Sequence, residues 1–208
     1  MDNLTYDKNR VINFSDAIFS IAMTLLVLEV GIPSLKGIAN NTIWTILHSR
    51  LPSFVGLIVS FFVSAIYWVA HLRHMKFVSE VDGKLLWLNI FLMFFIVLLP
   101  FSTGFYVVGI NYNGPFVFYC FNLSAIGLFN YLIINYIFKK EKGQTGLTPL
   151  LGKWHKAVAL NSLLIWVIAG AIVFMLPIVA RFLFFLIFIF EIFINKYFRK
   201  KVKQEASK

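Results

Sequence analysis

The chain has 208 residues, of which 60% are hydrophobic and only 13% are charged, and its formal net charge is +10. A soluble domain of this composition would lack a polar surface, so the composition excludes a water-soluble globular fold and indicates a membrane protein. Cys120 is the only cysteine, which excludes both a disulfide framework and a pair of redox thiols.

Apolar runs of membrane-spanning length recur along the whole chain. Each is close to the ~20 residues that cross a ~30 Å hydrocarbon core. We expect six spans, at residues 10–32, 51–72, 85–106, 115–138, 157–176 and 178–197. Because the connections are short, residues 1–208 are predicted to form one all-α, polytopic membrane domain with six transmembrane helices and a short basic tail.

Two of the connecting segments have a distinct composition. Residues 40–53, "NNTIWTILHSRLPS", are too short and too polar at their edges for a further span, so they predict an interfacial helix that leads to Pro52. Residues 139–149, "KKEKGQTGLTP", contain Gly and Pro and predict the longest loop on the inner side.

The basic residues predict the orientation of the domain. With six spans and an inner N-terminus, all 19 Lys and Arg residues except Lys36, Arg50 and Arg181 fall in inner segments. This bias over short loops places both termini in the cytoplasm by the positive-inside rule. The basic tail is expected to meet the anionic lipid of the inner leaflet and not nucleic acid.

Motifs for catalysis are missing from the sequence. Neither G-x-S-x-G nor H-E-x-x-H occurs. Asp16 also has no second carboxylate nearby in the membrane spans with which it could form an acid–base pair. We therefore predict that the protein is not an enzyme, that it needs no cofactor, and that it has no resident metal. Transport or conduction of ions is the natural remaining class.

The first span carries a polar stripe. At about 100° per residue, Ser20, Thr24, Leu28 and Ile21 follow Asp16 within about 140° of the helix circumference. This face mixes hydroxyls with bulky aliphatics. It could line a pore, or its hydroxyls could simply bond a carbonyl one turn back and join two helices.

Three motifs, in order, carry a resemblance to a known family. Arg10, Phe14, Ser15 and Asp16 spell R-x-x-x-F-S-D at the start of the first span. "YWVAHLRHMKF" at residues 67–77 and "DGKLLWLNIFLMFFIVLLPFST" at residues 82–103 follow. Together they resemble the transmembrane protein 175 family of endolysosomal and bacterial potassium channels, over about the first half of the chain.

The resemblance implies a potassium-selective, leak-type channel whose first helix lines the pore without a re-entrant filter loop. It implies a hydrophobic constriction at Ile21, with Leu25 and Leu28 as further aliphatic rings. Thr24 would be the hydroxyl that bears on selectivity, and Ser20 would add a hydroxyl one turn below. Hydroxyl oxygens can replace water around potassium weakly, while an aliphatic ring closes by dewetting.

The charged residues of the first span need partners in the bundle. We hypothesise that Arg10, Ser15 and Asp16 form a hydrogen-bond network with His71 or Asn89 that fixes the rotation of the first helix. The alternative for Arg10 is that its side chain only reaches the inner head groups. Glu29 is expected at the outer interface.

One copy of the first helix cannot enclose a pore. Since animal members of the family carry two six-helix repeats and pair as dimers, a single-repeat chain implies a homotetramer in a bacterial plasma membrane, with potassium ions as the permeating partner. A secondary transporter or proton-coupled carrier, using Asp16 and the histidines as a proton relay, is the alternative.

Overall fold

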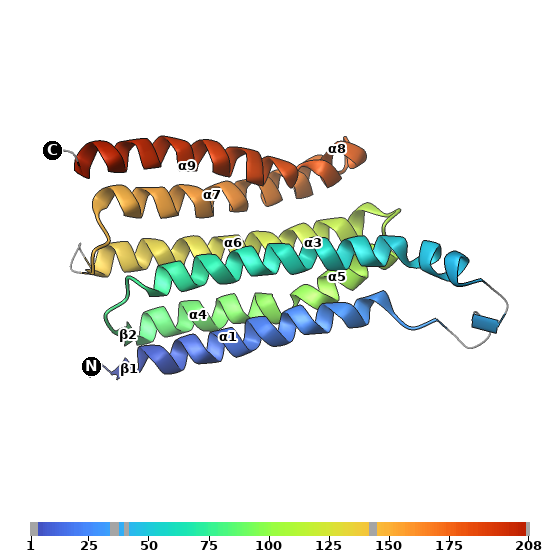
Figure 1. Ribbon diagram of the computed structural model, residues 1–208, viewed down its shortest axis with the longest axis horizontal. Helices are drawn as coiled ribbons and strands as arrows, with labels where there is room; N and C mark the ends of the chain where they lie inside the picture. The colour runs from blue at the N-terminus through green and yellow to red at the C-terminus, as the bar shows by residue number, and fades with distance from the viewer. Residues whose placement is uncertain (1–3, 34–37, 40–41, 142–144, 207–208) are drawn as a thin grey trace.

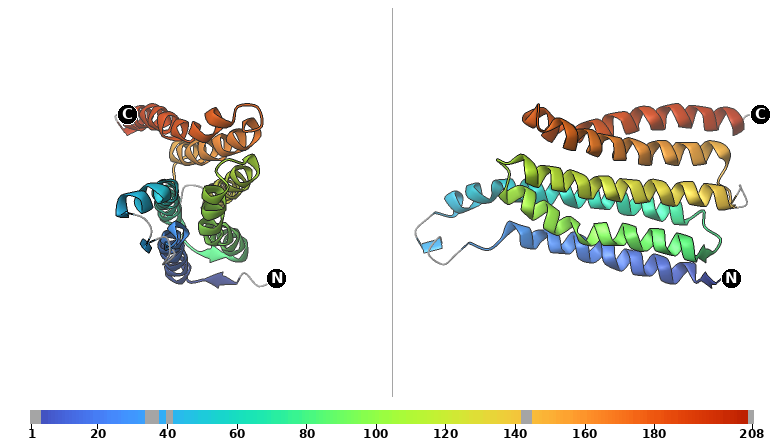
Figure 2. Two further views of the ribbon diagram at one scale, coloured as in Figure 1. Left: turned by 90° about the vertical axis from the view of Figure 1, so that its right-hand side faces the viewer. Right: turned by 180° about the vertical axis from the view of Figure 1, so that it is seen from behind.

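The computed structural model describes residues 4–33, 38, 39, 42–141 and 145–206. Long helices lie side by side in one bundle, and the chain ends that Figure 1 marks as N and C lie at the same end of it. Figure 2 shows α1 at one edge of the bundle and α9 at the opposite edge. The orientation of the bundle in a membrane, with both termini in the cytoplasm, stays a prediction.

The first half of the chain forms the edge that holds α1. Its elements are β1 (Thr5–Tyr6), α1 (Lys8–Leu25), the 3-10 helix η1 (Leu26–Val30), α3 (Ile43–Met75), β2 (Val81–Asp82), α4 (Gly83–Val97) and α5 (Leu99–Val108). The short strands β1 and β2 pair antiparallel, with Thr5 opposite Asp82 and Tyr6 opposite Val81. The fold is otherwise helical, as the sequence predicts.

The second half supplies the remaining layers. Its helices are α6 (Asn113–Glu141), α7 (Pro149–Ile172), α8 (Pro177–Phe182) and α9 (Phe185–Ala206). Within the described residues, five helical segments are long and apolar enough to cross a membrane: Lys8–Val30, Ile43–Met75, Gly83–Val108, Asn113–Glu141 and Pro149–Ile172. These five correspond to the first five predicted spans.

The predicted sixth span, residues 178–197, is not one continuous helix. It is divided between α8 and α9 by a turn at Leu183 and Phe184. The 22 residues of α9 are apolar only in their first half, because Glu191 and then several basic residues occupy the rest. Length and composition therefore do not make α9 a full span in the way they do for the five segments above.

Two further sequence predictions are corrected by the helix bounds. The interfacial helix expected before Pro52 is not separate. Pro52 lies inside α3, which has 33 residues and runs without a break from Ile43 to Met75. The third predicted span instead bends after Val97, where α4 gives way to α5. Pro100 lacks an N–H and its ring crowds the carbonyl of residue 96, which accounts for a break at this point.

The end of the bundle that holds both termini is closed by the loop of residues 76–82, between α3 and α4. Lys8 of α1 donates to the carbonyl of Val78 over 2.7 Å. Glu141, at the end of α6, accepts from both the N–H and the hydroxyl of Ser79 at 3.1 and 3.0 Å. This loop therefore joins the start of α1 to the end of α6.

Asp82, the last residue of this loop region, caps α4 and pairs with α6. Its carboxylate accepts from the Leu85 N–H at 2.9 Å and from the Tyr136 hydroxyl at 2.6 Å, and it lies 3.1 Å from Lys140 Nζ. Burial alone would raise the pKa of Asp82, but the hydrogen bonds from Tyr136 and Leu85 and the nearby Lys140 ammonium together lower it below its ordinary value.

Candidate functional site

The first helix has one buried face and one uncovered face. Asp7 caps its start by accepting from the Arg10 N–H at 2.9 Å. The buried face, which packs against α3, α4 and α5, consists of Val11, Ser15, Phe19, Ala22 and, in η1, Leu26. At about 100° per residue these positions lie opposite the stripe that begins at Ser20.

The stripe predicted to line a pore lies on the uncovered face. Ile21 is 58% exposed, Leu25 40% and Leu28 67%, and Ser20 and Thr24 are also exposed. Leu28 lies in the 3-10 helix η1, which the sequence did not predict. No other element of the described chain covers these five residues, which is costly for aliphatic side chains unless lipid or another subunit covers them.

The hydroxyl of Thr24 is held by its own helix. Its Oγ1 donates to the Ile21 carbonyl over 2.8 Å. A hydroxyl that donates its proton to a hydrogen bond still has free lone pairs on its oxygen, and those of Thr24 lie on the exposed face of the helix. Thr24 can therefore offer an acceptor oxygen to a cation.

A directional chain of hydrogen bonds ties the buried face of α1 to α4 and α3. Asn89 Nδ2 donates to Ser15 Oγ over 2.9 Å, and Ser15 in turn donates to the Val11 carbonyl at 2.9 Å. His71 Nε2 lies 2.8 Å from Asn89 Oδ1, an acceptor, so His71 carries its proton on Nε2. Ser15, His71 and Asn89 are almost fully buried.

Asp16 has a different partner from the one the sequence predicted. Its Oδ1 accepts from Trp68 Nε1 over 2.7 Å. Trp68 and His71 are three residues apart, so they lie on one face of α3 and contact neighbouring parts of the motif. Trp68 was missed from the sequence, although its place in the Trp-x-x-His pattern could have identified it.

Arg10 does not join the predicted network. Its backbone N–H bonds to Asp7, and no hydrogen bond or ion pair of its side chain is found with any described residue. Of the residues proposed for the network, the structure therefore brings Ser15, Asn89 and His71 together, places Asp16 beside them with Trp68, and leaves Arg10 at the surface.

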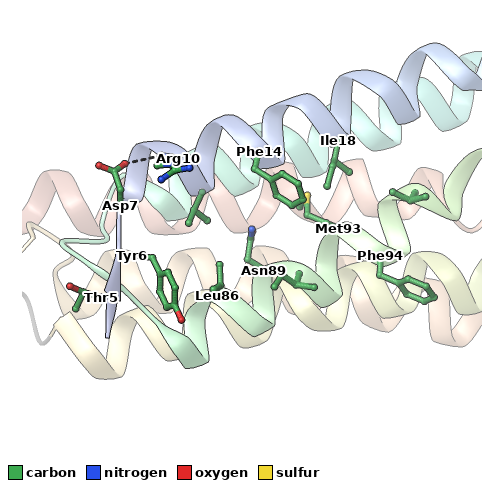
Figure 3. Close-up of a pocket in the computed structure, with 13 residues that line it drawn as sticks. Thr5, Tyr6, Asp7, Arg10, Phe14, Ile18, Leu86, Asn89, Met93 and Phe94 are labelled. Atoms are coloured by element: carbon green, nitrogen blue, oxygen red, sulfur yellow. Dashed lines mark hydrogen bonds between the residues drawn. The ribbon is translucent and has the colours of Figure 1, made fainter. Parts of the chain in front are cut away.

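Arg10 and Phe14 instead line an open groove between α1 and α4. The groove has a volume of about 790 Å³. Figure 3 shows Phe14 and Ile18 of α1 pointing toward α4, from which Asn89 and Met93 point back toward them. Phe14 is 56% exposed. An aromatic side chain left this open at the motif is available to a neighbouring molecule.

Glu29 points away from the stripe. A Cβ atom added at Gly104 would collide with the Glu29 carboxylate, so the carboxylate lies directly against the backbone of α5. The absence of a side chain at Gly104 leaves room for this carboxylate, which a larger residue there would displace. Glu29 therefore contacts a helix of its own chain, in line with the expectation that it does not line the pore.

Nothing in the described residues resembles a catalytic or metal centre. No group of three or more His, Cys, Asp or Glu side chains in the part of the chain that the structure describes could hold a metal ion. Cys120 is a buried free thiol. The five membrane-length helices define a multi-pass integral membrane protein.

Comparisons with known proteins show similarity to one family. The family model described as "Endosomal/lysosomal potassium channel TMEM175" matches residues 10–100. A protein named a potassium channel in a Chryseobacterium species is 26% identical over 197 residues, which cover 95% of this chain and 98% of that protein. Another from Streptomyces collinus is 35% identical over 98 residues, 47% of each chain.

Animal and structural relatives agree with these matches. The rat protein named "Endosomal/lysosomal proton channel TMEM175" is 27% identical over 136 residues, or 64% of this chain and 27% of that protein. The crystal structure of a TMEM175 homologue from Chamaesiphon minutus has the same fold, with a TM-score of 0.74, 21% identity, and coverage of 92% of this chain and 97% of that one.

Residues 10–100 of the chain are thus similar to the transmembrane protein 175 family, and the fold is that of a solved TMEM175 homologue. The bacterial relatives are named potassium channels, and the animal relatives are named proton channels.

Proposed function

We propose that this protein is a potassium-selective, leak-type channel of a bacterial plasma membrane. The bacterial relatives that match the chain are named potassium channels, and one of them aligns along nearly its whole length. The animal relatives are named proton channels, so proton permeation is the competing ion preference within the same class.

Four copies of α1 would line the pore in this proposal. The observation that carries it is the stripe of Ser20, Ile21, Thr24, Leu25 and Leu28, which the chain leaves exposed while it buries the opposite face of the same helix. A closed ring of subunits would cover the stripe from the side and leave its centre open to ions. A single chain offers only one such helix.

The aliphatic and the hydroxyl residues of the stripe would have different roles in the pore. Ile21 would form the tightest hydrophobic ring, and Leu25 and Leu28 would form further rings toward the end that lies opposite the termini. Thr24, with its lone pairs free, and Ser20 would offer weak oxygen ligands that permit fast exit of potassium. No loop of the re-entrant filter type is needed in this arrangement.

The network behind the stripe would fix the rotation of α1. Bonds from Asn89 and Trp68 reach adjacent residues of the helix, Ser15 and Asp16. Two bonds on successive residues restrict turning of the helix about its axis. Because the stripe and the network lie on opposite sides of α1, a change in the network would change which residues face the pore.

The decisive experiment is bilayer recording from the purified, reconstituted protein, with potassium on one side and sodium on the other. We expect unitary current steps, which carrier turnover is too slow to produce, and a reversal potential near that of potassium. Currents without unitary steps would favour a carrier, and a reversal potential that follows a pH gradient would favour a proton channel.

The oligomeric state is tested separately. Mass measurement of the protein in a mild detergent should give four copies per particle. A stable monomer or dimer under these conditions would contradict the tetrameric pore.

A further inference from the structure

A second polar region lies far from α1, in a groove between α3, α7 and α9. Three adjoining hollows of about 330, 860 and 470 Å³ form it, and all three share Asn195. We call them together the α9 groove. Figure 1 shows α9 at the edge of the bundle away from α1, so the groove is separate from the proposed pore.

The charge of the groove is mainly positive. Arg73 of α3 and Arg199, Lys196 and Lys200 of α9 line it, against one acidic residue, Glu191, among the described lining residues. Within the described chain, neither Arg73 nor Arg199 lies within ion-pair distance of a carboxylate. Unneutralised arginines at the side of a membrane helix bundle favour an anionic ligand, and their planar guanidinium groups match phosphate oxygens.

The floor of the groove holds two buried polar side chains whose hydrogen bonds are incomplete. His74 and Asn130 are each 2% exposed and interact with each other, but His74 Nδ1 and Asn130 Oδ1 have no hydrogen-bond partner of good geometry. Both residues line the 330 Å³ hollow. Buried polar atoms are usually satisfied, so the floor is suited to a ligand that carries hydroxyl groups, which can donate to Asn130 Oδ1, in addition to its charge.

The wall of the groove changes from polar to apolar along α9. Ala70 and Val69 of α3 and Phe188 and Ile192 of α9 line its apolar part. At the polar part, Trp154 Nε1 donates to Asn195 Oδ1 over 2.7 Å, and its ring stacks on Phe198 with centroids 6.2 Å apart. Tryptophan with one polar and one apolar side is typical of the head-group level of a bilayer.

We propose that the α9 groove is a binding site for an anionic phospholipid. The phosphate would contact Arg73 and Arg199, hydroxyl groups of the head group would reach the floor at His74 and Asn130, and one acyl chain would lie along the apolar wall. A free phosphate ion would use the arginines but not the apolar wall, and therefore fits only half of the groove. Basic pockets between membrane helices bind lipid head groups in this way.

The test is native mass spectrometry of the full chain in detergent during titration with dioleoyl-phosphatidylglycerol. Arg73→Gln/Arg199→Gln should weaken binding of this lipid by about tenfold or more, since each arginine contributes a charge-assisted hydrogen bond. The control Lys76→Gln/Lys139→Gln removes the same charge from exposed sites outside the groove and should weaken it less than about threefold. If both double variants lost the same amount of lipid affinity, the lipid would be held only by a general electrostatic attraction to basic residues, and the proposed site would be overturned.

A charge-neutral variant makes the test independent of the arginines and of their effect on folding. Ala70→Leu fills the apolar wall and should also weaken lipid binding, whereas Val167→Leu, on an exposed part of α7, should not. Unchanged binding by Ala70→Leu would overturn the proposal. So would equally tight binding of dioleoyl-phosphatidylcholine, or displacement of the bound lipid by millimolar inorganic phosphate.

Discussion

Trp68 Nε1 donates to Asp16 Oδ1 over 2.7 Å and so joins the last third of α3 to the first helix. Asp16 is only partly buried, and this indole is the one hydrogen-bond partner that the described residues give its side chain. The bond therefore holds a carboxylate that would otherwise lie unpaired among apolar helices, where an unpaired charge is costly.

Trp68→Phe should destabilise the protein because it keeps an aromatic ring but removes the donor. The loss is expected at about 1 kcal/mol, the low end of the usual cost of leaving a polar group without its partner, because Asp16 is only partly buried. Thermal unfolding in detergent measures it. Trp87→Phe, at a 60% exposed indole of α4, is the matched control and should leave the midpoint nearly unchanged. Equal shifts in the two variants would show that the bond contributes nothing.

Asp16→Asn is a milder change than loss of the indole, since the amide oxygen can still accept from Trp68. It should impair assembly or gating more than ion preference. Gel filtration and the permeability ratio, measured on the same preparation, distinguish the two effects. An altered ratio with intact assembly would place Asp16 in the ion pathway and contradict a structural role.

Asn89→Leu should break the buried chain at its centre. Ser15 and His71 would each lose a partner, and stability should fall by about 1–3 kcal/mol. The double variant Ser15→Ala/Asn89→Leu should lose less than the sum of the two single losses, because the two residues bond each other. Strict additivity of the unfolding free energies would show that the Ser15–Asn89 bond carries no energy.

Ile21→Asn tests the hydrophobic constriction. If four copies of Ile21 form the narrowest ring, a polar side chain there should wet the pore, raise the current and admit larger cations, since dewetting needs apolar walls. Bilayer recording with cations of increasing size measures this. Ile168→Asn, at an exposed site on α7, controls for a polar residue on a membrane helix. Loss of the tetramer without any gain in permeation would refute the pore assignment.

Thr24→Val tests the hydroxyl ligand at nearly constant volume. It removes the oxygen whose lone pairs remain free beyond the bond to the Ile21 carbonyl, so the preference for potassium over sodium should fall while the pore keeps its width. Thr24→Ser retains the hydroxyl and should retain the preference. Reversal potentials under opposed potassium and sodium gradients provide the measurement, and an unchanged ratio in Thr24→Val would exclude this role.

The sequence predicted the exposed face of α1 better than it predicted the contacts of the buried face. The membrane class, the first five spans and the stripe of Ser20, Ile21, Thr24 and Leu28 follow from hydropathy and helical periodicity, whereas Leu25 was added only by the family resemblance. Both are local properties of a chain segment, and a helix in a membrane must satisfy its backbone within itself. For the same reason the R-x-x-x-F-S-D motif could be read directly from residues 10–16.

The partners of the motif were decided by tertiary structure. Asn89 reaches Ser15 across 74 residues of sequence and Trp68 reaches Asp16 across 52, and no local pattern states which of several polar side chains on two packed helices will meet. The sequence therefore predicted the Ser15, Asn89 and His71 side chains as a set, but it included Arg10 wrongly and omitted Trp68.

Helix breaks were decided in the same way. Pro52 and Pro100 are the same residue type within apolar runs, yet α3 continues through Pro52 while the chain bends beside Pro100. A proline removes one hydrogen bond in either place, and only the packing of neighbouring helices decides whether the helix absorbs that loss or ends. Composition thus determined that this chain enters the membrane, while contacts between distant helices determined how its first helix is held.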